Sequence, residues 1–371
     1  LVALLYFLGT SCNVKDHTSE VTFKEAYSLL LEEDEDVVHV YAPKIITDYE
    51  DQLLVIPFDG KAIVQYDRRK GSILKKNLIS DLPQEEILSD LISRFSPEAD
   101  VDDVLSDAFA IEAMRFYAFI ESDNEVMVAL SMQIPKDSTI EYEGEMVRAR
   151  VFGFGLAVLS LDKNLNYKEH QVLYTSGMEA RLVNPASSDW LKKDNHLAIP
   201  LQFGNEASPG YRYIVMRKTE LGYKFSWLGS LQDLQGIKAY DDGFKKFAWS
   251  FSNNLVSVGN SIYEMVGLTE TGLELNEKYL VDNSTQGIRN FIIQNDAIYY
   301  EVGHPVDVFN SDTSRFEVRS VSLDGNNEKG KSIISREKRF EYSPCHFTEY
   351  GVYFINKPPN EPCELEFHPY R

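Results

Sequence analysis

Several features are scarce in this sequence, and each scarcity excludes a class of protein. No apolar run reaches the roughly 20 residues that a membrane-spanning helix needs. Lysine and arginine number 37 against 58 aspartates and glutamates, which gives a formal net charge of −21. So acidic a chain repels nucleic acid and anionic lipid headgroups, and we therefore expect no nucleic-acid partner.

Signatures of metal sites and of activated nucleophiles are also missing. The seven histidines form no H-E-x-x-H or H-x-H pair, and no G-x-S-x-G elbow occurs. The stretch from Asp162 to Asn166 has oxygen-bearing side chains at alternate positions, as a calcium loop begins, but it lacks the glycine at the sixth position. We interpret it as a hairpin turn and expect neither a metal nor another cofactor.

One stretch, residues 325–332, matches the phosphate-loop pattern G-x-x-x-x-G-K-[ST] letter for letter. A phosphate cradle must lie between a buried parallel strand and the N-terminus of a helix. Here the preceding segment alternates apolar and polar residues, Asp324-Gly325 is a hairpin-turn pair, and few residues follow. We interpret the stretch as a solvated hairpin loop and expect no nucleotide partner.

What the chain does contain is an apolar pattern of period two, rich in Val, Ile, Tyr and Phe, which favours β-strands. The sequence therefore predicts an all-β fold. The clearest predicted strands are residues 53–57, 62–67, 116–121, 126–134, 148–162, 197–203, 211–218, 255–258, 261–266, 297–302, 316–323 and 352–357.

A degenerate unit recurs in which a polar turn precedes two apolar strands. Six copies begin near Asp51, Asn124, Asn195, Asn254, Asn295 and Glu349, at steps of 73, 71, 59, 41 and 54 residues. Repeats of about 40 to 50 residues with several strands each are typical of β-propeller blades. We predict a β-propeller of six blades, within a range of five to seven; the alternative is two β-sandwiches.

One segment departs from the strand pattern. Its apolar residues at 87, 88, 91, 92 and 95 have helical spacing, and Pro83 suits a first helical turn. We predict a short helical insertion near residues 82–110. Between covering a channel mouth and packing on the edge of a blade, the interpretation favours packing.

The N-terminus begins with the uncharged apolar run Leu1 to Leu8, followed by Gly9-Thr10-Ser11-Cys12. This pattern is typical of the core of a signal peptide that is truncated at its N-terminus, and the small residues ending on cysteine resemble a lipobox. The resemblance implies that Cys12 carries a lipid. The alternatives are an ordinary secretory signal and a buried N-terminal strand. We predict a signal peptide over 1–11, a lipidated tether over 12–35 and the propeller over 36–371.

The remaining cysteines, Cys345 and Cys363, form an even pair in an oxidising compartment. Their spacing suits two neighbouring antiparallel strands near the C-terminus. We therefore predict a disulfide between them, against the alternative of two unrelated thiols.

With its lipobox-like start, short polar tether and degenerate blades, the chain resembles the six-bladed, TolB-like propeller lipoproteins of Bacteroidota envelopes. The resemblance implies an outer-membrane lipoprotein, facing the periplasm or the cell surface, that binds or scaffolds an unknown protein, peptide or glycan. The alternative is a carbohydrate-active enzyme, which needs a pair of facing carboxylates. No catalytic residue can be selected among 58 acids. A third reading, a subunit of an outer-membrane assembly, predicts an exposed apolar patch.

Overall fold

The computed structural model describes residues 25–41, 43, 45–49, 51–95, 112–121, 125–142, 144–176, 180–182, 191–203, 210–230, 250–252, 254–258, 261–269, 272–281, 288–303, 314–323, 330–338, 345–357 and 360–370. Within these residues, 25 strands form six antiparallel sheets, so the fold is all-β as predicted. Cys12 lies outside the described residues.

We number the sheets in chain order starting from β2, so the sheet that contains β1 together with the C-terminal strands is the last. Sheet I contains β2 (Ile45–Tyr49), β3 (Gln52–Ile56), β4 (Ala62–Asp67) and β5 (Ile73–Leu78). Sheet II contains β6 (Arg115–Glu121), β7 (Val126–Tyr142), β8 (Glu145–Leu161) and β9 (Tyr167–Ser176). Sheet III contains β10 (Ala180–Leu182), β11 (Leu191–Lys193), β12 (His196–Phe203), β13 (Gly210–Thr219) and β14 (Gly222–Ser230).

Sheet IV contains β15 (Ser250–Ser252), β16 (Leu255–Val258), β17 (Ser261–Thr269) and β18 (Gly272–Leu280). Sheet V contains β19 (Ile288–Gln294), β20 (Ala297–Gly303), β21 (Ser314–Ser322) and β22 (Lys331–Lys338). Sheet VI contains β23 (Cys345–Phe347), β24 (Gly351–Asn356), β25 (Glu364–Pro369) and β1 (Tyr27–Leu30).

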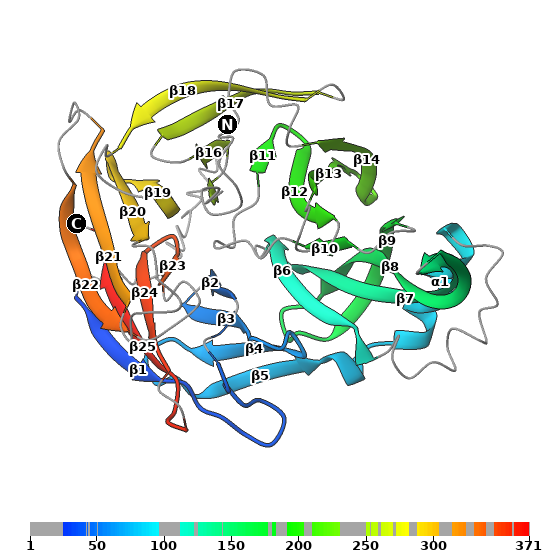
Figure 1. The fold of residues 1–371 in the computed structure, drawn as a ribbon. Helices are drawn as coiled ribbons and strands as arrows, with labels where there is room; N and C mark the ends of the chain where they lie inside the picture. The colour runs from blue at the N-terminus through cyan, green and yellow to red at the C-terminus, as the bar shows by residue number, and fades with distance from the viewer. Residues whose placement is uncertain are drawn as a thin grey trace, which may run out of the picture.

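The six sheets follow one another around a common centre (Figure 1). Strand contacts join each sheet to the next: β3 to β6, β8 to β10, β11 to β15, β15 to β19, β19 to β23, and β23 back to β2. Apolar cores fill the junctions, for example between sheets IV and V, between V and VI, and between VI and I. The hydrophobic core is thus divided among the interfaces between successive sheets.

Sheet VI is built from both ends of the chain. β1 pairs antiparallel with β25, in a register that places Tyr27 opposite Phe367 and Leu30 opposite Glu364. The predicted tether over residues 12–35 is therefore too long, because β1 lies inside it, and Leu29 of β1 and Leu31 directly after it are buried in the core between sheets VI and I. The period-two signal in so short a strand is weak, which is why the sequence did not reveal it.

The predicted helix is confirmed in its described part. α1 (Gln84–Phe95) follows the short 3₁₀ turn Ile79–Asp81 and buries Ile87, Leu88, Leu91 and Ile92. It contacts β9, the outer strand of sheet II, so it packs on the edge of a sheet. Residues 96–110 of the predicted insertion lie outside the described residues.

Turn chemistry fixes the hairpins. Asn295 and Asp296 join β19 to β20 with φ angles of 51° and 57°, the left-handed conformation that a two-residue hairpin requires. Gly60 has a φ of 66°, and its carbonyl accepts a 2.7 Å hydrogen bond from the amide of Phe116. A Cβ at this position would lie 2.7 Å from the Phe116 carbonyl oxygen, so only glycine lets sheets I and II approach this closely.

Candidate functional site

The junction between sheets VI and I, where the two ends of the fold meet, has the most developed set of polar and exposed apolar groups among the described residues. The connection from β1 to β2 crosses this junction. At its start, the Leu31 amide donates to the Cys363 carbonyl of sheet VI at 2.8 Å, and the Glu32 amide donates to the Gly71 carbonyl of sheet I at 2.8 Å. Two consecutive residues thus join the last sheet to the first.

Residues of this connection take part in a buried polar cluster. The His39 ring is 1% exposed, and its Nε2 lies 2.9 Å from the Tyr66 hydroxyl, which donates to the Glu32 carbonyl at 3.1 Å. Burial, with a smaller effect from the charge of Lys357, lowers the pKa of His39 from 6.5 to about 4. The imidazole is therefore neutral at physiological pH and acts as a packed hydrogen-bonding group.

A buried ion pair forms a second link between the two sheets. The Arg68 guanidinium pairs with the carboxylate of Asp48 on β2, and both side chains are almost fully buried. The guanidinium also lies 5.0 Å from the centre of the Tyr350 ring, and the Tyr350 amide donates to Asp48 Oδ2 at 3.3 Å. The pair on sheet I is thus tied to the β23–β24 turn of sheet VI.

An acidic run, Glu32 to Asp36, opens the connection, and most of its carboxylates are engaged locally. Asp34 Oδ1 accepts the amides of Asp36 at 3.0 Å and Val37 at 2.9 Å, and Lys76 Nζ lies 2.8 Å from Asp34 Oδ2. The bond to Lys76 is the main cause that lowers the pKa of Asp34. Glu33 Oε1 accepts the His39 amide at 3.1 Å, so this carboxylate fixes the backbone that follows.

Apolar side chains emerge directly after the acidic run. Burial alternates, with Val37 and His39 inside and Val38, Val40 and Tyr41 outside, at 52%, 65% and 55% exposure. The Tyr41 ring packs on Phe58 of the β3–β4 loop, with 4.9 Å between ring centres and 56° between ring planes. We call the four exposed side chains of Val38, Val40, Tyr41 and Phe58 the seam surface.

Two cations lie beyond Phe58 on the same loop and the adjoining sheet. Lys61 Nζ and the Arg115 guanidinium both donate to the backbone carbonyl of Glu112. Burial and the nearby Arg115 charge lower the pKa of Lys61. Both cations are thus turned toward the protein's own carbonyl group.

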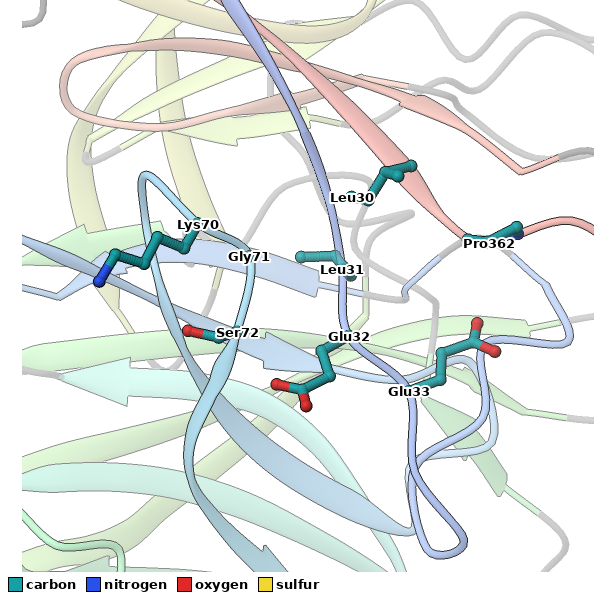
Figure 2. Close-up of a pocket in the computed structure, with 8 residues that line it drawn as sticks. All are labelled: Leu30, Leu31, Glu32, Glu33, Lys70, Gly71, Ser72 and Pro362. Atoms are coloured by element: carbon teal, nitrogen blue, oxygen red, sulfur yellow. The ribbon is translucent and has the colours of Figure 1, made fainter.

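A pocket of about 410 Å³ opens on the other side of the connection, lined by residues 30–33, residues 70–72 and Pro362. Figure 2 shows Leu30 and Pro362 on one side and Ser72 with Lys70 on the other, while the Glu32 carboxylate lies near Ser72. Glu32 Oε2 accepts the Ile73 amide at 2.7 Å. Leu30 is 58% exposed and gives the pocket an apolar wall.

The two C-terminal cysteines are buried in sheet VI, but they do not lie on neighbouring strands. Cys345 is on β23 and Cys363 immediately precedes β25, and β24 runs between them. Two strand spacings separate their backbones by about 9 Å or more, whereas a disulfide needs Cα atoms closer than about 7 Å. The structure accordingly departs from the predicted disulfide and places the two side chains in different apolar cores.

The stretches that resemble a calcium loop and a phosphate loop form ordinary turns and strands where the structure describes them. Asp162 Oδ1 accepts the amides of Asn164 at 2.7 Å and Asn166 at 2.9 Å, which makes residues 162–166 the predicted hairpin turn. Lys331 and Ser332 of the phosphate-loop match begin β22, a strand antiparallel to β21 and not a helix. Among the described residues, no group of three or more His, Cys, Asp or Glu side chains is arranged to hold a metal ion.

Hydrogen bonds are the main cause that lowers the pKa values of the carboxyl groups of Asp34, Asp67, Glu125 and Asp162. A glycosidase's general acid needs an upward shift, so none of these four has that character. The described helices include none with the length and apolar character to cross a bilayer.

No protein-family profile and no curated protein sequence matches this chain. Among solved structures, a Bacteroides fragilis protein described as exported is similar with a TM-score of 0.41 and 9% identity, covering 94% of this chain and 95% of its own. A Bacteroides caccae protein of unknown function gives 0.38 and 11%, covering 81% and 84%. PorZ, a surface component of the Porphyromonas gingivalis type-IX secretion system, gives 0.23 and 9%, covering 88% and 42%. At these low scores, the similarities carry no argument about function.

Proposed function

We propose that this chain is a lipid-anchored protein of the bacterial cell envelope, folded as a six-bladed β-propeller that holds a protein or peptide partner without catalysing a reaction. The fold proposal is supported by the cyclic order of contacts, in which each described sheet touches the one before and the one after it. Two β-sandwiches would instead pair the sheets two by two.

The seam surface is the single observation that carries the binding role. Aromatic and branched apolar side chains that lie together in water are typical of protein interfaces. The Tyr41 and Phe58 rings pack at a tilt, and Val38 and Val40 are exposed on the same β1–β2 connection as Tyr41. The branched side chains of Val38 and Val40 beside the aromatic pair favour a polypeptide partner with apolar side chains of its own.

The anchor is tested through Cys12. In a Bacteroides host that expresses the chain with a complete lipoprotein signal peptide, we expect the wild-type chain to incorporate an alkyne fatty acid and to sediment with outer membranes. Cys12→Ser should lose both the label and the sedimentation. Persistence of the label in this variant would contradict the proposed anchor.

The binding role is tested by placing a photo-crosslinking amino acid at Val40 in cells. We expect one defined adduct, identified by mass spectrometry and recovered again when its partner carries the crosslinker. The same probe at Leu221, which is 77% exposed on another sheet, is the control. Equal adducts from both positions, or none from Val40, would argue against a partner at this face.

A further inference from the structure

Exposed apolar side chains are concentrated at the junction of sheets VI and I. Twelve large apolar side chains are exposed among the described residues, and five of them, Leu30 and the four of the seam surface, belong to the β1–β2 connection, the end of β1 or the loop packed against it. Exposed apolar residues scattered singly are ordinary, whereas a contiguous group marks an interaction site.

The seam surface is held in place by the structure beneath it. The Val37 and His39 amides are bound by Asp34 and Glu33, and the Val37 and His39 side chains are buried. Tyr41 and Phe58 are in ring contact. A surface that is already ordered loses little conformational freedom when a partner binds, which favours affinity.

The charges around this surface are predominantly negative. Of the acidic run, the Glu32 and Glu33 carboxylates each accept a backbone amide, and Glu35 is exposed. Lys76 offsets Asp34 and Asp36, at 2.8 Å and 2.5 Å. Lys61 and Arg115 are turned toward the Glu112 carbonyl, and the chain as a whole carries −21. A basic partner is therefore attracted to this face and an acidic one is repelled.

From this placement we infer that the seam surface binds a polypeptide segment in which an aromatic or branched apolar side chain is flanked by lysine or arginine. The inference rests on the proposed binding function and specifies the chemistry of its partner. The apolar side chain packs against Val40, Tyr41 and Phe58, while the basic residue lies over the acidic run near Glu35.

A random nine-residue peptide library, displayed on phage and selected on the lipidated full chain in detergent micelles, tests the inference. We expect enriched peptides to carry an apolar or aromatic residue beside Lys or Arg. Synthetic copies should bind at least tenfold more weakly to Tyr41→Ser/Phe58→Ser and severalfold more weakly to Glu35→Lys or in high salt. Leu221→Ser/Met146→Ser removes two exposed apolar residues elsewhere and should bind as the wild type does. Thermal melts confirm that each variant folds.

Other results overturn the inference in distinguishable ways. Peptides that bind Tyr41→Ser/Phe58→Ser as well as the wild type would place the site elsewhere and leave the proposed binding function standing. Enriched acidic or uncharged peptides would contradict the partner chemistry. A dimer that these substitutions abolish, seen by sedimentation, would make a second copy the occupant. No enrichment and no dimer would contradict both the inference and the peptide-binding function.

Discussion

At the scale of single residues, the junction between sheets VI and I depends on positions where the backbone itself makes the contact. Gly71 has a φ of 68°, its carbonyl accepts the Glu32 amide, and a Cβ there would overlap the Leu30 carbonyl. Any other residue at position 71 would lower the stability of the fold in two separate ways, through the strained left-handed backbone and through the steric clash of its Cβ. A second glycine, Gly144, has a φ of 84° with open space around its Cβ position, so the two costs can be measured apart.

We predict that Gly71→Ala destabilises the fold far more than Gly144→Ala does. Gly144→Ala adds only backbone strain, about 1 kcal/mol, whereas Gly71→Ala adds the clash with Leu30 and should exceed it by about 2 kcal/mol or more. Urea denaturation of both variants gives the difference in the free energy of unfolding. Equal losses would show that the backbone of sheet I does not approach β1 this closely.

The two buried cysteines make a second prediction at this scale. Because β24 separates their strands, we expect both thiols of a Cys12→Ser chain to react with Ellman's reagent after denaturation without reductant. Prior reduction should not increase the count. A chain that yields thiols only after reduction would restore the predicted Cys345–Cys363 disulfide and contradict the register of sheet VI.

At the scale of elements, two buried histidines make the junction sensitive to acid. His39 belongs to the β1–β2 connection and its side chain is buried, and His346 lies on β23 and is hydrogen-bonded to the backbone of Pro43. Burial lowers the pKa of each from 6.5 to about 4. Between these values an unfolded chain takes up a proton that the folded chain does not, so stability falls as the pH falls from about 6.5 toward 4.

The expected loss between pH 7.5 and pH 5 is about 2 kcal/mol for each of the two histidines. Chemical denaturation at both pH values measures it. His39→Gln should halve the loss of stability that the two histidines cause together. His196→Gln, at a partly exposed position, controls for the substitution itself. A pH dependence unchanged in His39→Gln would contradict a neutral, buried imidazole at this junction.

The position of a strand within its sheet explains how well the sequence predicts it. All six predicted repeat starts, near residues 51, 124, 195, 254, 295 and 349, fall between an outer strand of a sheet and the strand that pairs with it; in sheet III these are β11 and β12, and β10 also pairs with β12. The predicted strands are mostly second and third strands, which are buried on both faces, as the patterns of β3, β4 and β24 illustrate. Outer strands such as β5 have a mixed, mostly half-exposed pattern that gives little periodic signal.

The uneven repeat steps have physical causes in particular elements. α1 lies within the first long step. The second contains β7 and β8, which stay paired from Val126–Leu161 to Tyr142–Glu145, far beyond their pairing with β6 and β9. The seam surface was not predicted, because exposure of Val38, Val40 and Tyr41 follows from the position of the β1–β2 connection across two sheets. An apolar run after five acids was the only local signal.

At the scale of the whole molecule, one short strand joins the N-terminal end of the described fold to its C-terminal end. β1 completes sheet VI, and the connection that follows it carries both the link to sheet I and the seam surface. Closure and the candidate binding surface are therefore coupled. If β1 detached from β25, we expect residues 31–41 to lose their fixed conformation. The proposed partner site depends on that conformation.

The most direct test of this account is a disulfide designed between β1 and β25. Ser28 lies directly opposite Glu366, whereas Glu364 is two residues away along β25 and opposite Leu30. We predict that Ser28→Cys/Glu366→Cys oxidises within one chain, so that proteolysis and mass spectrometry recover the two terminal peptides linked, while Ser28→Cys/Glu364→Cys links poorly. No link, equal links in both variants, or links only between chains would contradict closure of the six sheets by β1.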